Sequence, residues 1–159
     1  MFTENELEFS TFIFYSLSDS WNTSPAEVYK VLNSSGILDG YIIEAYDVLH
    51  TLGKEYLVED ITELVNDKGF HIERMISENA DKVQKIYKRE LENKIICNIA
   101  NMKTCGLRKA MDIYYSSNVP GKIEKEMGDV RELDVQALTK EAMKRKREFL
   151  FPCHFIYIR

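Results

Sequence analysis

The sequence predicts an all-α protein, and three observations lead to this prediction. Proline and glycine are scarce, with 3 Pro and 7 Gly in 159 residues, whereas β-rich folds need frequent turns. Apolar residues recur at helical spacing along most of the chain. The segment Ser24-Pro25-Ala26-Glu27 combines a capping box with a proline at the first helical position, which is a clear signal of a helix start.

Four helices are expected between positions 1 and 70. The first covers about residues 4–19 and should be buried on more than one side, because its apolar and aromatic residues cover a wide face, among them Phe9, Phe12, Ile13, Phe14, Tyr15 and Leu17. The second begins at Pro25 and ends near residues 33–36. The third covers about residues 38–49. The fourth covers about residues 55–67 and ends before Gly69, which is well placed as a helix C-cap.

The apolar pattern continues with little interruption through residues 72–102. It predicts either one long helix or two segments that separate near Asn79, and we favour the break. Two more helices are expected at about residues 106–115 and 134–148, with a short helix between them that begins at Pro120 and runs through Ile123 and Met127.

The two halves of the chain align with each other when Ile13 is paired with Ile95. The same register pairs Ser34-Ser35 with Ser116-Ser117 and Asp47-Val48 with Asp129-Val130, and the expected helices fall in the same order. The sequence therefore predicts a pseudo-repeat of two helical modules, residues 1–69 and 94–150, joined by a connecting helix over residues 70–93. An apolar tail, residues 151–159, either packs back on the bundle, with a short strand as one form, or contacts a partner or a second copy in a homodimer.

The halves carry opposite charge. Residues 1–70 contain 13 acidic and 3 basic side chains, a net charge of −10, and residues 71–159 contain 13 acidic and 18 basic, a net charge of +5. Such a division indicates that the halves face each other or that each faces a different partner.

Several classes of protein are disfavoured. Cys97, Cys105 and Cys153 are an odd number without metal-site spacing, which favours free thiols in a reducing compartment. The acidic start of the chain is unlike a signal peptide, and no run of about 18 apolar residues predicts a membrane span. We therefore expect a cytoplasmic protein without membrane association, metal or cofactor.

An acidic surface on the first module is the leading candidate for a binding site. Its residues are Glu44, Asp47, Glu55, Glu59, Asp60 and Glu63. The simplest interpretation is a solvated helix face. The functional interpretation is a contact surface for a partner with a basic surface.

A basic cluster in the last expected helix is the alternative candidate, and it consists of Lys140, Lys144, Arg145, Lys146 and Arg147. Cations at this position suit a helix C-terminus. They are also the residues that would contact the phosphates of a nucleic acid.

No catalytic constellation is expected. His50 is the natural general base, with Asp47 one helical turn earlier and Thr51 or Tyr56 nearby, but its position predicts that it caps the end of a helix. Cys153 and His154 are neighbours in sequence, which disfavours them as a nucleophile pair. Together with Cys97 and Cys105 they have a spacing that fits no standard structural zinc motif, which disfavours a zinc site.

A family resemblance adds to this picture. The segment from Tyr46 to Ile61 reads Tyr-Asp-Val-Leu-His-Thr, then a short turn that contains a glycine, then Glu-Tyr-Leu-Val-Glu-Asp-Ile. This segment resembles a small bacterial family known only as a domain of unknown function. The likeness covers about residues 9–66 and includes the helix from Pro25 to Leu32. Residues 94–143 resemble a second such domain less closely, through Asp112-Ile113-Tyr114-Tyr115-Ser116-Ser117, where Ser116 replaces the usual Asn.

The resemblance implies a partner-binding role, because such domains stand alone or serve as accessory modules in bacteria and their mobile elements. Some are found beside genes of ADP-ribosyltransferase-like toxins, which implies an antitoxin or inhibitor. The prediction is therefore a non-enzymatic protein-binding module whose acidic surface covers a basic surface of a toxin or of a nucleic-acid enzyme, as an antitoxin or a phage or plasmid inhibitor does. The alternative is a nucleic-acid-associated regulator that uses the basic cluster.

Overall fold

A computed structural model of the chain describes residues 1–70, 82–125 and 132–144, and every regular element in these residues is a helix, as the sequence predicts. The elements are α1 (Glu4–Trp21), α2 (Pro25–Ser34), the π-helix η1 (Leu38–Ile43), α3 (Tyr46–Leu49), α4 (Lys54–Asp67), α5 (Lys82–Lys103), α6 (Leu107–Tyr115), α7 (Val119–Lys125) and α8 (Val135–Ala142).

Capping residues explain where the first two helices begin. Thr3 starts α1 with a complete capping box, in which its hydroxyl accepts from the backbone N–H of Glu6 while the Glu6 carboxylate accepts from the backbone N–H of Thr3. Ser24 starts α2 by accepting from the backbone N–H of Glu27, with Pro25 at the first helical position, as predicted. The Glu27 carboxylate is ion-paired with Lys30.

The helix α1 is the centre of the first half. Leu7, Ile13, Phe14, Leu17 and Trp21 are all at most 6% exposed, which confirms that this helix is buried on several sides. The Trp21 indole N–H donates to the Thr62 hydroxyl at 2.9 Å and so ties α1 to α4. The end of α4 has the predicted glycine, because Gly69 has a φ of +90° directly after the C-cap.

The prediction of one helix over residues 38–49 is wrong. The chain forms the π-helix η1, turns at Ala45, and then forms α3, a single helical turn of 4 residues. Gly40 lies inside this segment, and a glycine in a helix interior weakens the α-helical conformation. Apolar spacing alone does not separate a π-turn from an α-helix.

The last expected helix is shorter than predicted. It ends at Ala142 rather than near residue 148, with Met143 as its C-cap, and a run of basic residues follows in the sequence. The helix expected at Pro120 is found as α7, which begins at Val119. Several predictions concern residues outside the described ranges. They are the expected break near Asn79, the end of the short helix at Met127, the side chains of Arg145, Lys146, Arg147, Cys153 and His154, and the tail of residues 151–159.

The pseudo-repeat is visible in the arrangement of the helices. In the register that pairs Ile13 with Ile95, the elements α1, α2 and η1 correspond to α5, α6 and α7, and a register shorter by one relates α4 to α8. The helix α1 packs against α2, η1 and α4, and in the second half α5 packs against α6, α7 and α8. Asn22 and Thr104 correspond in the same register, and both have a left-handed φ of 49° in the turn after the long helix. The two halves are therefore built on one plan.

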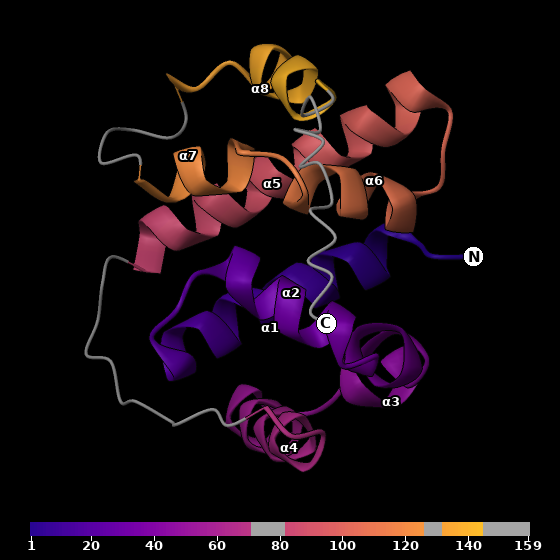
Figure 1. The fold of residues 1–159 in the computed structure, drawn as a ribbon, viewed down its shortest axis with the longest axis vertical. Coiled ribbons are helices and arrows are strands. Elements are labelled where there is room, and N and C mark those ends of the chain that lie inside the picture. The colour runs from indigo at the N-terminus through magenta and orange to yellow at the C-terminus, as the bar shows by residue number, and fades with distance from the viewer. Residues whose placement is uncertain (71–81, 126–131, 145–159) are drawn as a thin grey trace, which may run out of the picture.

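The halves pack against each other through α1 and α2 on one side and α5, α6 and α7 on the other (Figure 1). The described part of α5 runs without a break past residue 93, where the connecting helix was expected to end. Figure 1 shows α4 and α8 at opposite ends of the molecule, each on the outside of its own half. The first residue of α4, Lys54, lies 3.9 Å from Asp19, which also pairs with Lys85 of α5.

Candidate functional site

Most of the acidic candidates are exposed. Glu44, Asp47, Glu55, Glu59 and Glu63 all lie on the surface. Asp60 differs from them, because it is half-buried and accepts a hydrogen bond from the hydroxyl of Tyr41 in η1. Burial and the bond to Asp60 raise the pKa of Tyr41 to about 12. Asp60 therefore has a role inside the first half, and the other five acidic residues face solvent.

The glutamates of α4 follow the exposed side of this helix. The buried side consists of Leu57, Val58, Ile61, Thr62 and Val65, and it packs chiefly against α1. Glu55, Glu59 and Glu63 recur at every fourth position on the opposite side. Like charges at this spacing destabilise an isolated helix by about 0.2–0.5 kcal/mol per pair, so helix stability does not explain the arrangement.

Apolar side chains lie among these acidic residues. Val48 is 63% exposed, Leu52 is 37% exposed and Tyr56 is 56% exposed. They occupy α3, the following turn and the start of α4. We define the α3–α4 surface as these three residues together with the five exposed acidic ones: Glu44, Asp47, Glu55, Glu59 and Glu63. An exposed apolar group with a charged rim is typical of a protein contact surface.

His50 caps α3, as its position predicted. Its Nδ1 lies 2.7 Å from the carbonyl oxygen of Tyr46, and since a carbonyl only accepts, Nδ1 carries the proton. The imidazole also stacks on the Tyr46 ring, with 4.6 Å between ring centroids. Thr51 donates to the carbonyl of Val48, and no hydrogen bond joins Asp47 to His50, both of which the structure describes. The described residues therefore do not assemble the acid–base pair considered for an enzyme.

The alternative basic cluster is only partly described. Lys140 lies on α8 and Lys144 follows its C-cap, and both are exposed. The cysteines Cys97 and Cys105 are half-buried free thiols. Within residues 1–70, 82–125 and 132–144, no three side chains of His, Cys, Asp or Glu lie close enough together to hold a metal ion. None of the described helices is long and apolar enough to cross a membrane.

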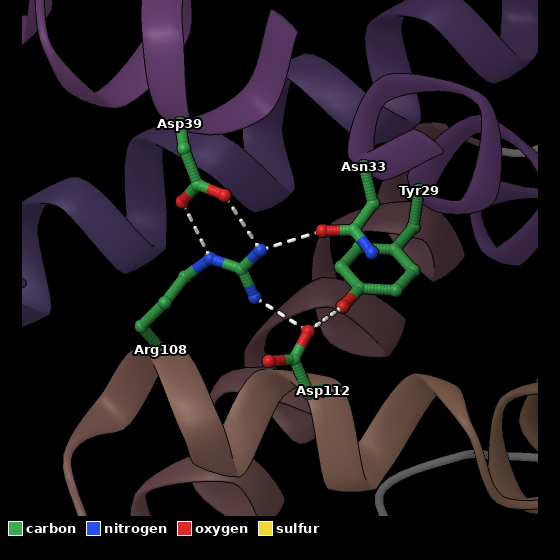
Figure 2. Close-up of polar contacts among 5 residues, drawn as sticks. All are labelled: Tyr29, Asn33, Asp39, Arg108 and Asp112. Carbon is green, nitrogen blue, oxygen red and sulfur yellow. Dashed lines mark hydrogen bonds and ion pairs between the residues drawn. The ribbon is translucent and has the colours of Figure 1, made fainter. Parts of the chain in front are cut away.

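A polar cluster that the sequence did not reveal joins the two halves (Figure 2). The guanidinium of Arg108 in α6 binds both carboxylate oxygens of Asp39, at 2.8 and 3.0 Å, and the side-chain oxygen of Asn33 at 2.6 Å. It also binds Asp112 at 2.6 Å, and Asp112 accepts from the hydroxyl of Tyr29. Because each of these groups has a partner within the protein, we interpret the cluster as a structural link.

A second unpredicted feature is the buried carboxyl of Glu92 in α5, which is 3% exposed. Its two oxygens accept from the hydroxyls of Tyr114 at 3.0 Å and Tyr115 at 3.1 Å, and Tyr15 of α1 adds a third hydrogen bond. Burial raises the pKa of Glu92 from 4.5 to about 7, although the three hydroxyls oppose this shift. The adjacent pair Tyr114-Tyr115 was the only signal in the sequence for such a site.

Comparison with known proteins gives one family and no individual relative. No curated protein and no solved structure matches the chain. Residues 8–68 match a family described as Protein of unknown function (DUF3791). This supports the expectation of an uncharacterised family for about residues 9–66. The specific motif and the resemblance of residues 94–143 to a second such domain stay predictions. The matched residues contain the whole α3–α4 surface, which therefore belongs to the part of the chain that resembles this family of unknown function.

Proposed function

We propose that this protein is a non-enzymatic protein-binding module, and that its α3–α4 surface binds a partner with a basic surface. The observation that carries the proposal is the combination of three exposed apolar side chains with five exposed carboxylates within one stretch of the chain, residues 44–63. The apolar side chains supply contact area, and the carboxylates select for a basic partner and speed its association.

The position of α4 supports the same proposal. Its buried side packs chiefly against α1, and Figure 1 shows the helix on the outside of the first half. A partner therefore has access to it without displacing another of the described helices. Glu55 and Glu63 make no ion pair within the described residues, so their charge is available to a partner. An inhibitor or antitoxin, as implied by the family resemblance, is one protein that would use such a surface against a toxin or a nucleic-acid enzyme.

The experiment is an affinity capture of the tagged full chain from a lysate of its source cells, treated with nuclease. The test variants are Tyr56→Ala and the double charge reversal Glu55→Lys/Glu63→Lys. Both change exposed side chains and leave the buried side of α4 intact. The control is the charge reversal Glu132→Lys, at an exposed residue of the second half.

The proposal expects a stoichiometric protein partner that is released by salt, lost in both test variants and retained by the control. A partner held equally by all four proteins would contradict it. Recovery of nucleic acid, with loss of protein after nuclease treatment, would instead favour the basic cluster around Lys140 and Lys144.

A further inference from the structure

A cavity of about 380 Å³ lies where α1, α3 and α5 meet, on the side of α3 that carries Tyr46 and His50. The first half contributes Asn5, Glu8, Phe9 and Phe12 from α1, together with Tyr46 and His50. The second half contributes Arg89, Glu90 and Asn93 from α5. We call it the aromatic pocket, and it is separate from the α3–α4 surface.

The floor of the aromatic pocket is a continuous row of rings. Phe12 and Phe9 stack with centroids 6.4 Å apart, Phe9 meets Tyr46 edge-on at 5.5 Å, and Tyr46 stacks on His50 at 4.6 Å. At one end of this row the guanidinium of Arg89 lies 5.6 Å from the centroid of Phe12. The protein thus already places one guanidinium against these rings, where the electron-rich face of an aromatic ring attracts a cation.

Two carboxylates make the pocket acidic. Glu8 and Glu90 occupy corresponding positions of α1 and α5 in the pseudo-repeat, and both are exposed. Neither forms an ion pair within the described residues, and neither does Arg89. The Nδ1 proton of His50 is already bound by the carbonyl oxygen of Tyr46, so it is not a donor for a ligand. With two carboxylates against one guanidinium, the pocket favours a cation over an anion.

The pocket wall also contains an unsatisfied acceptor. Asn93 lines the pocket, and its side-chain oxygen is buried and has no hydrogen-bond partner among residues 1–70, 82–125 and 132–144; a buried acceptor without a donor is unfavourable. A ligand with several N–H groups would supply that donor. Aromatic faces, two carboxylates and an amide oxygen are together the partners that a planar guanidinium with five N–H donors requires.

We propose that the aromatic pocket binds an arginine side chain of the partner protein. This inference rests on the proposed function, because it identifies the residue type with which a basic partner would anchor itself beside the α3–α4 surface. The guanidinium stacks on the row of rings, its N–H groups donate to Glu8 and Glu90, and one donates to the amide of Asn93. The second half of the chain then takes part in recognition, because Glu90 and Asn93 belong to α5.

The test uses Nα-acetyl-arginine amide as the probe and its neutral isostere Nα-acetyl-citrulline amide as the control ligand, titrated into the isotope-labelled full chain. The readouts are the NMR signals of the His50 ring and of the Asn93 side-chain amide. The test variant is Glu8→Gln/Glu90→Gln, which keeps the size of both exposed side chains, and the control variant is Glu132→Gln.

We expect saturable shifts of both signals with the arginine probe and none with the citrulline probe. The dissociation constant should rise about tenfold in Glu8→Gln/Glu90→Gln, the effect of losing two exposed ion pairs, and stay unchanged in Glu132→Gln. Absence of saturable shifts, equal shifts with citrulline, or unchanged affinity in the double variant would each overturn the proposal.

The two proposals fail separately. A captured partner that is lost in Glu55→Lys/Glu63→Lys but retained by Glu8→Gln/Glu90→Gln would leave the α3–α4 surface as the binding site and remove the arginine pocket. Binding of the arginine probe, together with a captured protein that tolerates every change in α4, would leave the pocket and remove the proposed function of the α3–α4 surface.

Discussion

The buried Glu92 carboxyl makes a sharp prediction about stability and pH. Its pKa in the folded protein is about 7, against 4.5 for an ordinary glutamate. Between these two values the folded state holds the proton more firmly than the unfolded state does. The unfolding free energy therefore falls as the pH rises from below 4.5 through about 7, because the folded protein must then bury a charge.

The size of the effect follows from the same two values. At about 1.4 kcal/mol for each unit of pKa difference, full ionisation of Glu92 costs about 3 kcal/mol. Part of this cost is already present at about pH 5, so the contribution of this one group should change by about 2–3 kcal/mol between about pH 5 and pH 8. This is a large share of the stability of a domain, which is about 5–15 kcal/mol.

The variant Glu92→Gln isolates this contribution. The amide has the shape of the carboxyl, accepts from one of the two hydroxyls of Tyr114 and Tyr115, and donates to the other. It does not ionise. We therefore expect the variant to gain about 2–3 kcal/mol relative to the wild type as the pH rises from about 5 to about 8.

Urea unfolding at several pH values, followed by the fluorescence of the single tryptophan, Trp21, measures the difference. Glu90→Gln, at an exposed position of the same helix, serves as the control, because its stability should follow that of the wild type. If the stabilities of Glu92→Gln and the wild type changed in parallel with pH, the argument for a buried, proton-binding carboxyl would be refuted.

Two further predictions concern the framework of the fold. Arg108→Ala should lower the unfolding free energy by about 1–2 kcal/mol, because it leaves Asp39 and Asp112 without their guanidinium partner. Arg108→Lys should recover part of this loss, because it keeps the charge but not the bidentate contact. Urea unfolding at low and high salt measures both variants, and a change below about 0.5 kcal/mol would place the cluster among surface ion pairs of little effect. Gly69→Ala should lower the unfolding free energy by about 1 kcal/mol, because an alanine is strained at the φ of +90°. Gly121→Ala inside α7 should raise it by up to about 1 kcal/mol, because an added Cβ meets no atom within 4 Å there. Thermal unfolding measures both variants, and a change of the melting temperature in the same direction for both would contradict this reasoning.

Local signals in the sequence predicted most of the helices. Ser24, Pro25 and Gly69 mark helix ends because capping depends on backbone conformation and on one nearby side chain, and the structure confirms all three positions. The capping box at Thr3 and Glu6 carries the same kind of signal and went unrecognised. The division of residues 38–49 into a π-helix and one turn was not predictable from apolar spacing, because Leu38, Ile42 and Leu49 are buried in either arrangement.

Contacts between the halves were not predictable from local patterns. The charge division raised two alternatives, and the pairs of Arg108 with Asp39 and of Lys85 with Asp19 show that part of the opposite charge meets across the interface between the halves. Nothing in the sequence selects these carboxylates from the 13 of residues 1–70. Glu92 is a similar case, because a glutamate on a long helix is expected to be exposed, and only the fold brings tyrosine hydroxyls from α1 and α6 to it.

The pairing across the interface also explains why the candidate surface is acidic. Asp19 and Asp39 are neutralised by Lys85 and Arg108 of the second half, which lie within reach of that side of the first half. Figure 1 shows α4 on the outside of the first half, and its exposed residues Glu55 and Glu63 make no ion pair within the described residues. The negative charge of the first half is therefore left concentrated on the α3–α4 surface and beside the aromatic pocket. Raising the salt concentration should consequently slow the association of the protein with a basic partner. The pKa of Glu92 should not change with salt, because its carboxyl is shielded from solvent.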